Sequence, residues 1–393
     1  MIYLFVFILL LFLSFRYDIN GKSEGRDNCY YLVLVILILI AGLRWRLGSD
    51  TPSYIYSFYH ETPVLSDYFE KGVSIKYPLW VLLNSVVFTI GGKFFWVQII
   101  HATFVNTLYF KYIKKHSPYI FTCALLYYVW MFTNQNMETM KASMAIVVCL
   151  FGNDCMLEKK RIKGILLYFL ACLFHFSAAL LFLTPFLLFL RFNKIGLVVL
   201  FLTYIIGGII QASMGEYLMI FDFSEDIAER AETYVNSDTY GASKNIMYFF
   251  INVLPFIVYS ILSVLYLKKK KKGSDLLKYE PYLVIGMLFL ILKNNVFIFY
   301  RYVQFYYIYV VLFVAYVFID IIVSQTRLNK VLALARAIIV FFPILIIFSM
   351  YNITRKPMYY PYSSVIERSI NTKRERNYSS IGHFLPPPNK NEY

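Results

Sequence analysis

Long apolar runs alternate with short polar segments along most of the chain. Each run approaches the roughly 20 residues that a helix needs to cross about 30 Å of hydrocarbon. The pattern therefore predicts an all-α, polytopic integral membrane protein with about 12 transmembrane helices. We expect the spans near residues 2–15, 29–43, 94–112, 118–133, 137–153, 164–175, 177–191, 195–212, 246–267, 279–293, 297–321 and 331–350.

Basic residues gather in six short clusters between these runs. Cytoplasmic loops of membrane proteins are enriched in lysine and arginine, so we place all six clusters inside. Every second connection then lies outside, and both chain ends face outward. The clusters are Arg16/Lys22/Arg26, Lys111/Lys114/Lys115, Lys159/Lys160/Arg161/Lys163, Arg191/Lys194, Lys268 to Lys272, and Arg327/Lys330.

The apolar segment Tyr77–Ile90 is not counted as a span. Counting it would move the cluster at Lys111 to Lys115 to the outer face, and the segment is short. We expect an interfacial, outward-facing helix here, within a long outer loop at 44–93. A second outer loop is expected at 213–245, and it is acidic.

The whole of 1–351 is thus expected to form a single multi-span domain. The remainder, 352–393, contains Pro386-Pro387-Pro388 and mixed charges. These features predict a poorly packed C-terminal tail.

Composition excludes a water-soluble globule. Hydrophobic residues make up 59% of the 393 residues and charged residues only 16%, so too little polar surface exists to cover a soluble fold. The net charge of +15 is divided among loop clusters, which marks topology and not nucleic-acid binding. The five cysteines have no paired or metal-ligand spacing, and no P-loop, GxGxxG or HExxH motif is present. We expect no cofactor and no metal.

The polar residues of the apolar part are expected at one depth, the outer margin of the membrane. Fixed charge at this depth is costly without a partner, and several cations at one level suit a di-anion. The sequence therefore predicts an outward-facing pocket for a lipid-borne phosphate. Its candidate residues are Arg44, Arg46 and Asp50 after the second span, Asn134, Asn136, Glu138 and Lys141 near the fifth, His175 and Ser177 in a turn, and Asn294, Asn295 and Arg301 near the eleventh.

Each of these residues also has a simpler interpretation. Arg44 and Arg46 could reach lipid headgroups, and Asp50 could cap the following helix, which starts Ser49-Asp50-Thr51-Pro52. Glu138 and Lys141 could neutralise each other on one helical face. His175 could be a packing histidine, and Arg301 could be a cation–π anchor among tyrosines.

These residues also carry a family resemblance. The chain resembles the EpsG/Wzy-like family of bacterial polysaccharide polymerases over roughly residues 1 to 350. The resemblance is carried by Leu43-Arg44-Trp45 with Gly48, Asp50 and Tyr54, by Tyr77-Pro78-Leu79 with Asn84 and Gly91-Gly92, by Tyr112 to Ser117, by Phe174-His175 with Ser177-Ala178 and Pro185, and by Tyr300-Arg301-Tyr302. The chain departs from the family at Lys141, where Arg-Gln-x-x-Ala is usual. Lysine keeps the charge but lacks the bidentate fork of arginine.

The resemblance implies a glycosyltransferase in the cytoplasmic membrane of a bacterium, with its active site facing outward. It would join polyprenyl-diphosphate-linked oligosaccharide repeat units, one as donor and one as acceptor, as in O-antigen, capsule or exopolysaccharide synthesis. The implied catalytic bases are Asp50 or His175, with Glu138 behind them. Residues expected to bind the diphosphate or sugar are Arg44, Arg46, Lys141, Arg301, Tyr54 and Tyr300.

Expected partners are these lipid-linked substrates and membrane lipids, with a chain-length regulator as a further candidate. Two other functions stay open at this point. One is a related transferase, such as an O-antigen ligase or an enzyme that uses polyprenyl-phosphate sugars. The other is a flippase or transporter of lipid-linked oligosaccharides, although transporters usually show repeated halves and polar residues at mid-membrane.

Overall fold

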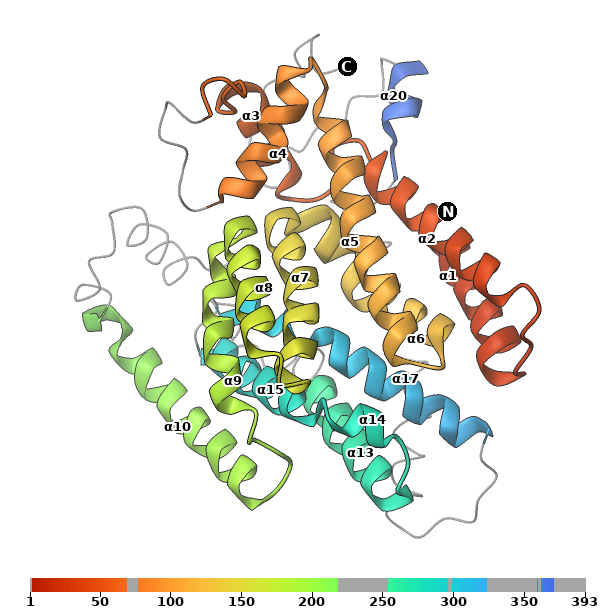
Figure 1. Cartoon of the computed structure of the whole chain (residues 1–393), viewed down its shortest axis with the longest axis vertical. Helices are drawn as coiled ribbons and strands as arrows, with labels where there is room; N and C mark the ends of the chain where they lie inside the picture. Colours follow the sequence, from red (N-terminus) through yellow and green to blue (C-terminus); the bar gives the residue numbers. More distant parts are fainter. Residues whose placement is uncertain are drawn as a thin grey trace. The chain divides into compact units, whose positions relative to one another are not determined.

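A computed structural model describes residues 2–68, 77–217, 254–295, 299–323, 359 and 362–370. Within these ranges every regular element is a helix, apart from one isolated β-bridge between Arg44 and Ser364 (Figure 1). The predicted all-α class is therefore confirmed. The chain divides into two compact units, residues 1–179 with 340–393 and residues 180–339, and each is described by itself.

The first unit begins with helix α1 (Ile2–Leu13), which continues into a π-helical turn, η1 (Ser14–Ile19). Helix α2 (Arg26–Gly42) packs along α5 (Phe94–His116), and α1 packs against α6 (Ile120–Tyr127). After α6 the chain forms two further π-helical turns, η2 (Tyr128–Phe132) and η3 (Asn134–Glu138). The observed helices match the predicted spans at 2–15, 29–43, 94–112 and 118–133 to within a few residues.

Helices α7 (Met140–Leu157) and α8 (Arg161–Phe174) form a tight antiparallel hairpin (Figure 1). Gly152 of α7 permits the close approach, because a Cβ atom there would lie 2.7 Å from the ring of Tyr168. The same tyrosine donates a hydrogen bond to Asn153 Oδ1 at 2.6 Å. A small residue and a polar contact between apolar helices are a packing device that membrane proteins often use.

Two shorter helices form much of the predicted outer loop 44–93. They are α3 (Thr51–His60) and α4 (Pro78–Thr89), and α4 packs against α5 and α8. At about 1.5 Å per residue, the 12 residues of α4 extend about 18 Å, well short of the roughly 30 Å of hydrocarbon in a bilayer. The length agrees with the decision not to count this segment as a span.

Basic side chains mark one end of the first unit. Lys114, near the end of α5, pairs with Asp27 at the start of α2 at 2.7 Å. The adjacent Lys115 pairs with Asp154 near the end of α7 at 2.6 Å. Because α2 and α8 run opposite to α5 and α7, the Arg44 turn, the start of α7 and His175 all lie at the other end. The unit therefore has a basic end and, opposite to it, an end that carries most of the candidate site.

The second unit is also helical. Helix α10 (Lys194–Tyr217) packs on α15 (Glu280–Asn295), and α13 (Leu254–Lys270) packs on α17 (Tyr307–Val323). Helices α15 and α17 are also in contact, and there the rings of Tyr282 and Tyr309 stack with centroids 4.7 Å apart. The predicted span at 297–321 is interrupted between α16 and α17. The elements are η4 (Phe176–Leu183, whose first residues belong to the first unit), α9 (Thr184–Leu187), α10 (Lys194–Tyr217), α13 (Leu254–Lys270), α14 (Ser274–Leu277), α15 (Glu280–Asn295), α16 (Tyr300–Val303) and α17 (Tyr307–Val323).

Large apolar side chains lie exposed along whole helix faces, as a lipid-facing surface requires. On α10 these include Phe201, Tyr204 and Ile206, and on α8 they include Ile162 and Phe169. Among the described residues, Ile2–Ile19 and Met140–Leu157 are long and apolar enough to cross a bilayer. The structure thus supports a membrane protein, while the count of twelve spans stays a prediction. The span at 331–350 and most of the loop 213–245 lie outside the described residues.

Candidate functional site

The turn after α2 is built around a buried arginine. The Arg44 side chain has 0% exposure, although it is long and charged. Its guanidinium donates to the carbonyl oxygens of Ala41 and Leu47 and contacts the sulfur of Met140 at 3.2 Å. Since a buried charge requires such partners, Arg44 ties the end of α2 to the turn and to the start of α7.

Gly48 lets this turn approach the neighbouring segment. Its φ of +102° is a backbone conformation that residues with a side chain rarely adopt. A Cβ atom at this position would lie 2.2 Å from the carbonyl oxygen of Met137. Glycine is therefore required here both by the backbone angle and by the close contact.

Glu138 holds the start of helix α3. Its Oε2 accepts the backbone N–H groups of Ser49 at 2.8 Å and Asp50 at 3.3 Å, and also the Ser49 hydroxyl. Asp50 occupies the N-cap position of α3, but its side chain makes no capping hydrogen bond. A carboxylate from another segment therefore supplies the cap. Its negative charge interacts favourably with the helix dipole, as the charge of a local capping side chain would. Within the described part of the chain, the second oxygen, Oε1, is buried without a hydrogen-bond partner.

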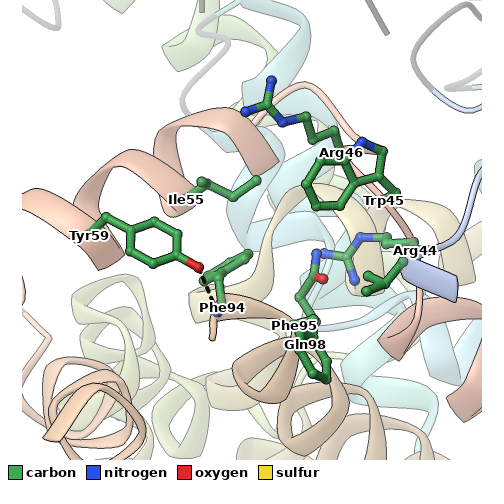
Figure 2. Close-up of a pocket in the computed structure, with 9 residues that line it drawn as sticks. Arg44, Trp45, Arg46, Ile55, Tyr59, Phe94, Phe95 and Gln98 are labelled. Carbon is green, nitrogen blue, oxygen red and sulfur yellow. Dashed lines mark hydrogen bonds between the residues drawn. The ribbon is translucent and has the colours of Figure 1, made fainter. Parts of the chain in front are cut away.

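A pocket opens beside the Arg44 turn (Figure 2). It holds about 310 Å³ of space, including the part open to solvent. Figure 2 shows Gln98 beside the Arg44 guanidinium, Trp45 and Arg46 above them, and Tyr59 across the opening. The lining residues are Arg44, Trp45, Arg46, Ile55, Tyr59, Phe94, Phe95, Gln98 and Val365.

Two polar side chains of this pocket have distinct environments. The Arg46 guanidinium lies over the Trp45 ring, 5.4 Å from its centroid, in a cation–π contact. Gln98 is only 2% exposed, and its Nε2 atom has no hydrogen-bond partner among the described residues. A buried amide donor without a partner is costly, so its presence favours a ligand with an acceptor oxygen.

The C-terminal region supplies one wall of the pocket. Trp45 N–H donates to the Ser363 carbonyl oxygen, and Val365 N–H donates to the Leu43 carbonyl oxygen, both at 2.8 Å. Tyr362 donates its hydroxyl proton to the Ile40 carbonyl oxygen at 3.0 Å, and burial raises the pKa of this hydroxyl to about 12. The tail 352–393 was expected to be poorly packed, yet residues 362 to 365 within it pair with the turn.

A second cluster surrounds Lys141. The ammonium group of Lys141 lies 4.7 Å from the ring centroid of Tyr77 and 5.4 Å from that of Tyr54. The Tyr77 ring also lies against the imidazole of His175, with centroids 5.0 Å apart. The described contacts of the Glu138 carboxylate come from Ser49 and Asp50, so the alternative in which Glu138 and Lys141 neutralise each other finds no support among them.

The pocket and the Lys141 cluster share a common framework. Helix α3 contributes Tyr54 to the cluster, and Ile55 and Tyr59 to the pocket. Arg44 contacts Met140, the residue before Lys141. Five segments that are distant in sequence therefore meet at one end of the first unit: the Arg44 turn, α3, the start of α4, the start of α7 and the turn at His175.

Comparison with known proteins assigns the family. Residues 27–364 match the model of the EpsG family. The chain belongs to the EpsG family. No curated protein and no solved structure matches it. The matched range of this EpsG-family chain includes the Arg44 turn, the Lys141 cluster, most of the first unit and the whole of the second, and it ends at Ser364, in the segment that pairs with the turn.

Most of the candidate residues predicted for this EpsG-family chain lie together. Arg44, Arg46, Tyr54, Glu138, Lys141 and His175 take part in the contacts above, and Asp50 begins α3 and is exposed. Arg301 is exposed on α16 and lies in the second unit, so its distance from the others is not described. Tyr300 precedes it on α16, and its side chain lies outside the described part. Within the described ranges, no three or more His, Cys, Asp or Glu residues gather as metal ligands would.

Sequence reasoning overlooked Gln98. The signal for Gln98 was present: Gln98 and His101 stand three residues apart on one face of the otherwise apolar start of α5. His101 uses this face to contact the Ser143 hydroxyl at 2.8 Å. Polar residues that repeat at helical spacing inside an apolar run mark a buried polar face, and this rule would have found the pocket wall.

Proposed function

We propose that the protein is a polysaccharide polymerase: a glycosyltransferase that joins polyprenyl-diphosphate-linked oligosaccharide repeat units at the outer face of the cytoplasmic membrane. Family membership supports a role of this general kind. The observation that carries the specific proposal is the gathering of Arg46, Lys141 and His175 against aromatic rings, with Asp50 at the N-cap of α3, at one end of the first unit.

The charge distribution supports the orientation. The basic ends of α5 and α8 lie opposite the site, and cytoplasmic loops are the ones enriched in lysine and arginine. The site end would then face outward, where lipid-linked repeat units are displayed after they cross the membrane. Exposed apolar faces on α1, α8 and α10 would face the acyl chains.

The cations and rings suit the two parts of such a substrate. Arg46 and Lys141 would bind the diphosphate and stabilise the negative charge that develops on it as it leaves. Arg301 stays a further candidate for this task. The half-buried rings of Tyr54 and Tyr59 offer apolar faces on which sugar rings can stack. Gln98 offers a donor to an acceptor oxygen. Arg44, in contrast, is engaged by main-chain carbonyls and would position the turn.

The transfer step breaks the bond between the anomeric carbon of the donor sugar and the diphosphate oxygen, and the electron pair leaves with the polyprenyl diphosphate. The acceptor hydroxyl oxygen bonds to the anomeric carbon and gives up its proton to a base. Asp50 is the best candidate for this base because its carboxylate is exposed at the edge of the site. The Glu138 carboxylate is already committed to the N-terminus of α3.

The direct test is a reaction with purified protein and its lipid-linked repeat unit, with the products separated by size. A polymerase gives a ladder that extends by whole repeat units. A single addition to a different acceptor would indicate a ligase or a related transferase, and unchanged substrate would reject the proposal. Arg46→Ala should lose the ladder, whereas Arg161→Ala, at the exposed start of α8 at the opposite end, should keep it.

A further inference from the structure

His175 sits in an extended residue immediately after α8, where the helix ends. Its Nδ1 atom accepts the backbone N–H of Ser177 at 3.2 Å, and the Ser177 hydroxyl lies 2.7 Å from the same nitrogen. Both residues are buried, with 9% and 8% exposure. The ring also packs against Tyr77, which contacts the Lys141 ammonium group. The orientation of the imidazole is thus fixed on two sides.

The hydrogen bond from the Ser177 backbone N–H to Nδ1 determines which nitrogen of the His175 imidazole carries the proton. A backbone N–H can donate but cannot accept, so Nδ1 must offer its lone pair. A neutral imidazole carries one proton, and it must then be on Nε2. In this tautomer the ring presents an N–H group at its far end. A group that already carries a proton at Nε2 cannot remove another one there.

We propose that Ser177 holds His175 as the Nε2–H tautomer, so that His175 donates a hydrogen bond to an anionic phosphate oxygen of the lipid-linked substrate and does not act as the base. This role rests on the proposed function. It places a donor in the same cluster as Lys141, since both residues contact the Tyr77 ring, and it leaves Asp50 as the base. Ser177 is a positioning residue that acts through His175.

The tautomer can be measured independently of activity. The protein contains five histidines, so selective ¹⁵N-histidine labelling of the detergent-solubilised protein gives few signals. His175→Gln identifies the signals of His175 by their loss. We expect the chemical shift of an unprotonated nitrogen at Nδ1 and of a protonated one at Nε2. The opposite assignment would overturn the proposal.

The role is tested by three substitutions in the polymerisation assay. The amide nitrogen of His175→Gln can reach the region of Nε2 and donate, but it cannot act as a base near neutral pH. The shorter amide of His175→Asn cannot reach that region, and His175→Ala has no donor. We expect the glutamine variant to stay within about tenfold of the wild-type rate. The asparagine and alanine variants should fall by about a hundredfold or more, as after loss of an oxyanion donor.

The results separate the two roles. If His175 is the base, the glutamine variant falls by about a hundredfold or more together with the others, while its melting temperature stays normal. That pattern would overturn the donor role. Ser177→Ala keeps the backbone N–H that sets the tautomer and removes only the hydroxyl that helps to orient the ring. It should reduce the rate roughly tenfold in the wild type and have no effect in the His175→Ala background, a coupling that a purely structural role would not give. Wild-type protein without any activity would reject the proposed function and this role with it, while the tautomer would still be decided by the spectra.

Discussion

Replacing Glu138 with glutamine tests whether this carboxylate holds α3 or takes part in the chemistry. Its Oε2 accepts two backbone N–H groups and one hydroxyl group at the start of the helix. The amide oxygen of glutamine can accept the same bonds, so only the negative charge near the helix N-terminus is lost. Such a charge is typically worth about 0.3–1 kcal/mol. Even if all of this energy were lost from the geometry of the site in the transition state, the rate of polymer formation would fall by no more than about fivefold.

The alternative role predicts a much larger effect. Removing a general base typically reduces the rate by about 10²–10⁴-fold. Glu138→Ala, which removes the cap, should instead lower the stability of the protein by about 0.5–2 kcal/mol. The assay is the initial rate of ladder formation, together with the melting temperature followed by tryptophan fluorescence in detergent.

The matched control is Glu61→Gln at the other end of the same helix. Glu61 is exposed and accepts a hydrogen bond from the Ser57 hydroxyl, so this change should alter neither the rate nor the melting temperature. If Glu138→Gln reduces the rate by a hundredfold or more with an unchanged melting temperature, Glu138 is a catalytic residue and its role as a cap is not its main one.

Three further predictions concern the turn and the orientation. Gly48→Ala should destabilise the protein by about 1–3 kcal/mol or more and stop polymer formation, because φ is +102° and the new Cβ atom would meet the Met137 carbonyl. The control Gly91→Ala should destabilise the protein less, because φ is +73° but no atom lies within 4 Å of the new Cβ atom. Equal melting temperatures for the two variants would contradict this. Arg44→Met should lower stability by about 1–3 kcal/mol because the Ala41 carbonyl loses the Arg44 donor and the Leu47 carbonyl keeps only the Thr51 hydroxyl, whereas an unchanged melting temperature would mean that Arg44 serves only the ligand. Cysteines introduced in 213–245 should react with an impermeant reagent added outside intact cells, and labelling only after lysis would reverse the orientation.

The helices of the first unit could be predicted from the sequence because they are set by a local property. A run of apolar residues of sufficient length forms a helix in a membrane whatever its neighbours are, since no other arrangement satisfies the backbone there. The predicted runs 94–112 and 118–133 therefore correspond closely to α5 and to α6 with η2. The short helix expected within 77–90 corresponds to α4, while its interfacial position stays a prediction.

The contacts that build the site could not be predicted in the same way, because they join segments that are distant in sequence. Nothing near Asp50 indicates that Glu138, 88 residues away, caps its helix. Nothing in residues 362 to 365 indicates that their backbone pairs with the turn at 43–45. The residue types were identified, but their roles depend on which partners the fold brings to them. Arg44 and Arg46 illustrate this, since two arginines in one motif have different environments.

The spacing of this motif has a physical explanation in the structure. Arg44 is buried and fixes the turn through main-chain carbonyls, so Trp45 is held with its ring available to Arg46. Gly48 then brings the chain against Met137, which places Ser49 and Asp50 within reach of the Glu138 carboxylate. In the Leu-Arg-aromatic-x-x-Gly-x-Asp element, Arg44 thus fixes where Trp45 lies, and Gly48 fixes where Asp50 lies. The two arginines therefore differ: the Arg44 guanidinium contacts main-chain carbonyls and the Arg46 guanidinium lies over the Trp45 ring, which is why the proposed function gives the ligand to Arg46 and the turn to Arg44.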